Sequence, residues 1–183
     1  MAKARSQRKK SAKLRRAQAG RPASDSRRER SLREHLVQLL SKEQAHAGFD
    51  SAVASFPTVM RGKRIAGSPH TPWQLLEHLR IAQWDILEFS RNPNHVSPSF
   101  PEGYWPATEA PPDGAAWERS VRAFRADLRA MIALVRNSRN DLFAPISGGQ
   151  GQTLLREAML VADHNAYHLG QFLLLRRIAG ARG

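Results

Sequence analysis

The sequence predicts an all-α protein: a four-helix bundle preceded by a disordered basic tail. Four segments carry apolar residues at the three- and four-residue spacing of an amphipathic helix, and no segment with strand periodicity competes with them. Helix-capping signals begin two of these segments, and loops join all four. Four helices joined by loops are typical of a bundle. We therefore expect a tail over residues 1–30 and a bundle domain over residues 31–183.

Residues 1–30 hold most of the positive charge. They contain twelve Lys or Arg and two acidic residues, so +10 of the net charge of +13 lies there and residues 31–183 carry the remaining +3. Such a segment, with almost no large apolar residue, cannot bury enough surface to offset the entropy of ordering. One interpretation is an arm that makes weak, non-specific contacts with nucleic acid through its phosphates. The other is a solvated extension, or a stretch that precedes the true start.

Composition excludes several classes of site. The chain has no cysteine, so disulfides, thiolate metal sites and a cysteine nucleophile are ruled out. A transition-metal site must then use His and carboxylates. No apolar run is long enough to span a bilayer, and residues 1–30 lack the apolar stretch of a secretory signal. We expect a cytoplasmic protein without membrane contact.

The first helix is predicted to begin at Ser31. Ser31 and Glu34 have the spacing of a capping box, in which each side chain accepts a hydrogen bond from the other residue's backbone amide. Apolar residues then follow at helical spacing: Leu32, Leu36, Leu39 and Leu40. Residues 50–56 are predicted to form a short additional turn.

The second helix has the clearest start in the sequence. Thr71 suits the N-cap, Pro72 the first helical position and Gln74 the capping-box partner. Asn92-Pro93 is predicted to end it. The loop over residues 94–112 contains five prolines and three aromatic residues, which are Phe100, Tyr104 and Trp105. We expect this loop to be ordered and to wall a pocket, because exposing so many aromatic rings would be costly.

The last two helices follow the same reasoning. The third is predicted from about residue 113 to 140, and the fourth from about Thr153 to Ala179. The glycine-rich stretch 148–151 that joins them is interpreted as a turn. Gly180 suits the left-handed residue that stops a helix.

Two of the seven histidines are placed to share a metal ion. His164 and His168 lie four residues apart on the fourth predicted helix, so their imidazoles point the same way. His78, on an inward face of the second helix, offers a third ligand. Three neutral imidazoles suit Zn, Ni, Fe or Mn and leave positions open for substrate or water. The alternative is that these histidines are ordinary surface residues or hydrogen-bonded core residues.

Two carboxylates are candidates for catalysis. Asp85, two turns beyond His78, could accept an imidazole N–H or serve as an auxiliary ligand, and Glu157 could do so from the other helix. Either could also carry a proton. His46 and His70 lie near loop ends, where each could line a pocket.

Two stretches resemble a known family. Residues 68–85, SPHTPWQLLEHLRIAQWD, are similar to the second helix of DinB-like proteins, and residues 162–171, ADHNAYHLGQ, are similar to the fourth. The DinB/YfiT-like superfamily consists of four-helix bundles that hold a divalent metal with one histidine from helix two and a pair from helix four. By motif position, the resemblance implies His78, His164 and His168 as the metal ligands. It covers about residues 31–181.

The resemblance also implies a range of activities. Relatives include transferases and isomerases that use thiols such as bacillithiol or mycothiol, and many are dimers. We therefore expect a divalent-metal-dependent enzyme that acts on a small-molecule substrate, either as a thiol-dependent S-transferase or as a hydrolase. A low-molecular-weight thiol is its expected partner, and a homodimer is its expected assembly. The alternatives are a non-catalytic metal-binding or stress-response module, and a nucleic-acid-associated protein that acts through its basic tail.

Overall fold

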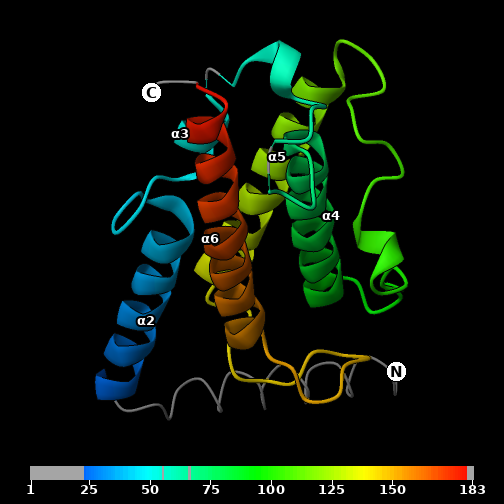
Figure 1. Cartoon of the computed structure of the whole chain (residues 1–183). Helices are drawn as coiled ribbons and strands as arrows, with labels where there is room; N and C mark the ends of the chain where they lie inside the picture. Colours follow the sequence, from blue (N-terminus) through cyan, green and yellow to red (C-terminus); the bar gives the residue numbers. More distant parts are fainter. Residues whose placement is uncertain (1–22, 55, 66, 181–183) are drawn as a thin grey trace. The chain divides into compact units, whose positions relative to one another are not determined.

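The structure is a computed structural model that describes residues 23–54, 56–65 and 67–180. Its helices are α2 (Ala23–Ser41), α3 (Phe49–Val53), α4 (Pro72–Arg91), α5 (Ala116–Arg136) and α6 (Leu154–Ile178), with short 3-10 turns η1 (Thr58–Met60) and η2 (Glu102–Tyr104) (Figure 1). These ranges contain no strand, so the predicted all-α class is confirmed. None of their helices could cross a membrane. Most of the predicted tail lies outside the described residues.

The predicted start of the first helix is wrong. Helix α2 begins at Ala23, so Ser31 lies inside the helix and cannot cap it. Charged residues with good helix propensity extend the helix toward its N-terminus without an apolar stripe, and Glu29 and Arg33 form an ion pair of 2.6 Å one turn apart. The chain divides into two units within this helix, residues 1–35 and 36–183. The site described below lies entirely in the second unit.

Helix α4 begins where the sequence predicts. The Thr71 side chain accepts from the Gln74 amide at 3.2 Å, and the Gln74 side chain accepts from the Thr71 amide at 3.0 Å. The Thr71 hydroxyl also donates to the backbone oxygen of Glu109 at 2.6 Å. The helix ends at Arg91, with Asn92 as its C-cap, as predicted. The N-terminus of the helix that carries His78 is therefore held by its own cap and by a distant loop.

The core of residues 36–183 forms where α4 packs against α5 and α6, which run beside it (Figure 1). Phe124 of α5 is fully buried and stacks on Phe49 of α3, with ring centroids 3.8 Å apart. Leu40, near the end of α2, is buried and lines a cleft together with Leu128 of α5 and Leu169 of α6. Helices α3, α4, α5 and α6 therefore share one buried cluster, and the end of α2 adds the buried Leu40, as expected of a helical bundle. The predicted additional turn near residue 50 is α3, and Gly180 has the predicted left-handed φ of 76°.

The loop between α4 and α5 is ordered, as predicted, but only part of its aromatic cluster packs. Tyr104 and Trp105 lie against α4, whereas Phe100 is 84% exposed. Trp73 of α4 donates from its indole nitrogen to the Thr108 hydroxyl at 3.1 Å. With the Thr71–Glu109 hydrogen bond, this contact fixes the loop over the first turns of α4.

Candidate metal centre

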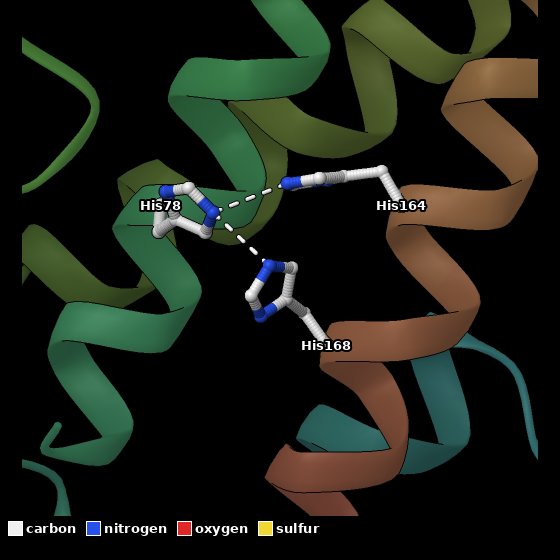
Figure 2. Close-up of side chains that lie close together, drawn as sticks. All are labelled: His78, His164 and His168. Atoms are coloured by element: carbon white, nitrogen blue, oxygen red, sulfur yellow. Dashed lines mark hydrogen bonds between the residues drawn. The ribbon is translucent and has the colours of Figure 1, made fainter. Parts of the chain in front are cut away.

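Three imidazoles converge between α4 and α6 (Figure 2). The Nε2 atom of His78 lies 3.1 Å from the Nε2 of His164 and 3.1 Å from that of His168. The ligand atoms of all three lie within 4.8 Å of one another, and no other His or carboxylate in the described ranges joins this group. The four-residue spacing on α6 and the packing of α4 against α6 bring the predicted triad together.

Hydrogen bonds fix the tautomers of two of these rings. The Nδ1 of His78 lies 2.9 Å from the backbone oxygen of Tyr104, and the Nδ1 of His168 lies 3.1 Å from the side-chain oxygen of Gln171. Both partners can only accept, so each Nδ1 carries the proton. In a neutral ring the Nε2 then has a lone pair. His78 and His168 therefore turn two lone pairs toward each other, an arrangement that a shared cation stabilises.

The triad fits a divalent transition metal. An ion at about 2.0–2.1 Å from each imidazole nitrogen holds two such nitrogens about 2.9–3.4 Å apart, for angles between octahedral and tetrahedral. The separations of 3.1 Å from His78 lie in this range. His164 has a buried Nδ1 without a hydrogen-bond partner in the described part of the chain. Its hydrogen bonds, unlike those of the other two rings, do not favour a particular tautomer.

Burial keeps the three rings uncharged. It lowers the pKa of His78 and of His168, and it lowers the pKa of His164 to about 3, with further contributions from the neighbouring His168 and His78. His78 and His168 are only 8% and 9% exposed. At neutral pH all three are thus neutral imidazoles, the form that binds metals.

Comparison with protein families identifies the fold. The family model of the DinB superfamily matches residues 25–172. The chain belongs to the DinB superfamily. This match confirms the resemblance carried by residues 68–85 and 162–171. Searches of curated proteins and of solved structures gave no match.

In this DinB protein, Asp85 lies behind the triad rather than in it. Its buried carboxylate accepts from the Nε2 of His95 at 2.7 Å and from the Tyr104 hydroxyl at 2.7 Å. The backbone oxygen of the same Tyr104 accepts from His78. Asp85 is thus linked to His78 through Tyr104, the loop residue whose backbone oxygen orients the His78 ring. Burial, followed by the bond to Asp85, raises the pKa of Tyr104 to about 12, so the phenol remains a donor at neutral pH.

Sequence reasoning missed the parts played by His95, Tyr104 and Gln171. His95 was one histidine among seven, with no spacing that linked it to another. Gln171, three residues after His168 on the same helix, could have been recognised as a partner by its spacing. No sequence pattern predicts that the Tyr104 backbone oxygen accepts a hydrogen bond from His78, which lies 26 residues earlier in the chain.

The second predicted carboxylate, Glu157, lies in the interior on α6. It is 2% exposed and accepts a hydrogen bond from Arg156 at 2.7 Å. It contributes no atom to the group formed by the three histidines. The catalytic role expected of Glu157 remains a prediction.

A cleft of about 500 Å³ opens beside the DinB triad. His168 and Gln171 form part of its wall, together with Trp105 and His70. The Trp105 ring stacks on His78, with centroids 4.0 Å apart, and on His70, with centroids 3.8 Å apart. The predictions that the aromatic loop walls a pocket and that His70 lines one are therefore confirmed. His46 lines the cleft near the end of α2 that Leu40 also lines.

Proposed function

We propose that this DinB superfamily protein is a divalent-metal-dependent enzyme. His78, His164 and His168 would hold the metal, and the cleft beside His168 would hold the substrate. One observation carries the proposal: the Nε2 lone pairs of His78 and His168, fixed by hydrogen bonds at the opposite ring nitrogens, lie 3.1 Å apart, and the Nε2 of His164 lies 3.1 Å from that of His78. The metal would be Zn, Ni, Fe or Mn, all of which accept imidazole ligands.

The chemistry fits an S-transferase or a hydrolase. A bound divalent ion would act as a Lewis acid that makes a thiol or a water molecule nucleophilic at neutral pH. The chain supplies the setting for that step. Gln171 and the Tyr104 backbone orient two ligand rings, and Trp105 covers a face of His78 and excludes water from it. A low-molecular-weight thiol is the expected partner of the transferase reaction.

Asp85 has a supporting part in this proposal. It does not reach the metal ligands, so it acts as a positioning residue rather than as a catalytic one. Its hydrogen bonds with His95 and Tyr104 hold the loop in the place where the Tyr104 backbone oxygen accepts a hydrogen bond from the Nδ1 of His78. Groups behind metal ligands commonly contribute about 10–100-fold to affinity or activity.

Turnover tests the proposal. Full-length protein, purified without an affinity tag and loaded separately with each of the four metals, is assayed with thiols against a panel of electrophiles and with ester and amide substrates. We expect turnover with at least one metal, its loss in His164→Ala, and its retention in His46→Ala, which removes an exposed histidine outside the triad. Wild-type rates that equal those of His164→Ala with every metal would contradict the proposed enzymatic function and favour a non-catalytic metal-binding module.

A further inference from the structure

The wall of the cleft beside His168 has no charged side chain among the described residues that line it. Its apolar part consists of Leu75, Trp105, Leu174, Leu175 and Ile178. Its polar groups include His70 and Gln171, and Gln171 is hydrogen-bonded to the metal ligand His168. The cleft thus has a polar region next to the triad and an apolar region along α6.

A basic group beside the cleft, Arg64, is already engaged. Arg64 donates to the backbone oxygen of Pro69, a residue of the wall, and pairs with the Glu109 carboxylate. Its guanidinium therefore has a counter-charge before any ligand arrives. None of the described residues in this wall carries a positive charge. An anionic ligand would lose hydration on entry and gain no ion pair in return, which is unfavourable.

Two apolar residues of the wall are exposed as well. Leu174 is 56% exposed and Ile178 is 54% exposed, one turn apart on the last part of α6. Covering them with an apolar ligand removes their surface from water, which is favourable. A cleft of about 500 Å³ is within the size range of small-molecule sites.

We infer that this cleft selects an uncharged, largely apolar small molecule, an inference that rests on the proposed function. The apolar body of the ligand lies along Trp105, Leu174 and Ile178, and its reactive polar group lies at the end formed by His168 and Gln171. A thiol that carries carboxylates finds no counter-charge in this wall. The cleft is therefore the site of the apolar second substrate, such as an aryl or alkyl electrophile.

Two fluorescent probes test this selectivity. N-phenyl-1-naphthylamine is uncharged, and 1-anilinonaphthalene-8-sulfonate has the same ring system with one added sulfonate. In fluorescence titrations of the full-length protein, we expect the uncharged probe to saturate a single site and the sulfonate to bind about tenfold or more weakly. We expect Leu174→Arg to reverse the preference, because it places a cation in the wall.

Met159→Arg is the matched control. Met159 lies on the same helix, is 54% exposed and is outside the cleft, so its replacement adds the same charge without touching the wall. Equal affinities for the two probes in the wild type would overturn the inference. So would an unchanged preference in Leu174→Arg, or the same reversal in Met159→Arg. Both substituted side chains are exposed, and circular dichroism confirms that each variant is folded.

Metal content, measured on the same samples, distinguishes a failure of this inference from a failure of the proposed function. Protein that carries one metal per chain but does not bind the uncharged probe overturns the cleft assignment and leaves the metal centre standing. Protein that binds the probe with the expected preference but takes up no metal supports the selectivity of the cleft and contradicts the metal-dependent function.

Discussion

At the scale of single residues, the capacity of the proposed centre to bind a metal depends on which ring nitrogen of His78 and of His168 carries the proton. The Tyr104 backbone oxygen and the Gln171 side-chain oxygen each accept a hydrogen bond from an Nδ1–H, which leaves the Nε2 lone pair of His78 and of His168 facing the site. The sequence alone could predict the cluster of His78, His164 and His168 from their spacing and family resemblance. It could not predict these acceptors, because one of them is a backbone oxygen in a loop without periodicity.

Loss of the bond between Asp85 and Tyr104 is expected to weaken metal binding. Tyr104→Phe keeps the backbone oxygen that accepts from His78 but removes the hydroxyl that holds this segment to Asp85 at 2.7 Å. We expect the metal dissociation constant to rise about tenfold, measured by competition with a chromogenic chelator. The visible spectrum of the cobalt-substituted variant should also change, which a mere loss of stability would not cause.

The control for this variant is Glu88→Gln. It removes a carboxylate from an ion pair with Arg91 on the same helix, away from the triad. Unchanged affinity and an unchanged cobalt spectrum in Tyr104→Phe, equal to those of Glu88→Gln, would show that Tyr104 has no positioning role.

The same phenol gives a prediction for alkaline pH. Its pKa is raised from 10.0 to about 12 in the folded protein, so the folded state holds this proton more tightly than the unfolded state. The corresponding stabilisation is complete below pH 10 and is lost as pH rises toward 12. In an ultraviolet titration of phenolate absorbance, the component that ionises near pH 12 should be absent from Tyr104→Phe. A wild-type Tyr104 that ionises at 10 would contradict both the burial of this phenol and its hydrogen bond to Asp85.

At the scale of elements, the helices whose caps lie in the sequence were predicted best. Thr71 and Gln74 form the predicted capping box, and α6 starts directly after the predicted Thr153. Helix α2 was misplaced because its first turns are polar and carry no apolar stripe to mark them. Capping and periodicity therefore predicted α4 and α6, the two helices that carry the three clustered histidines.

The cap of α4 gives a prediction about stability. Thr71→Ala removes the acceptor for the Gln74 amide and the donor to the Glu109 backbone oxygen. We expect the free energy of unfolding in urea to fall by about 1–2 kcal/mol. Thr71→Ser, which keeps the hydroxyl, should restore most of it. A loss in Thr71→Ala no larger than that of Thr58→Ala, a change at an exposed threonine, would contradict the role of the cap.

At the scale of the whole molecule, the sequence predicted the fold class, the triad and a pocket walled by the aromatic loop, but not the position of this cleft along α6. The cleft arises where the loop after α4 places Trp105 beside α6, and that path follows from tertiary contacts such as those of Thr71 and Trp73 with the loop. Dimer formation and a cytoplasmic location remain predictions.

The basic N-terminal segment gives a prediction that is independent of the metal centre. Removal of residues 1–22, which contain nine Lys or Arg and no acid, should abolish any binding of the full chain to double-stranded DNA or RNA. Such binding should weaken steeply with salt, because each phosphate contact releases counterions. Binding that survives the truncation, or that does not depend on salt, would exclude the segment as the nucleic-acid contact.

We propose that one divalent metal ion is held by three residues together: His78, His164 and His168. The most direct measurement is the metal content of full-length protein, purified without an affinity tag, supplemented in turn with Zn, Ni, Fe and Mn, and dialysed. We predict about one ion per chain for at least one of these metals, as expected of a single site with three protein ligands. Each of the three His→Ala variants should lose that ion, whereas His46→Ala should keep it. Wild-type protein that stays free of all four metals, or triad variants that retain as much metal as His46→Ala, would contradict the claim.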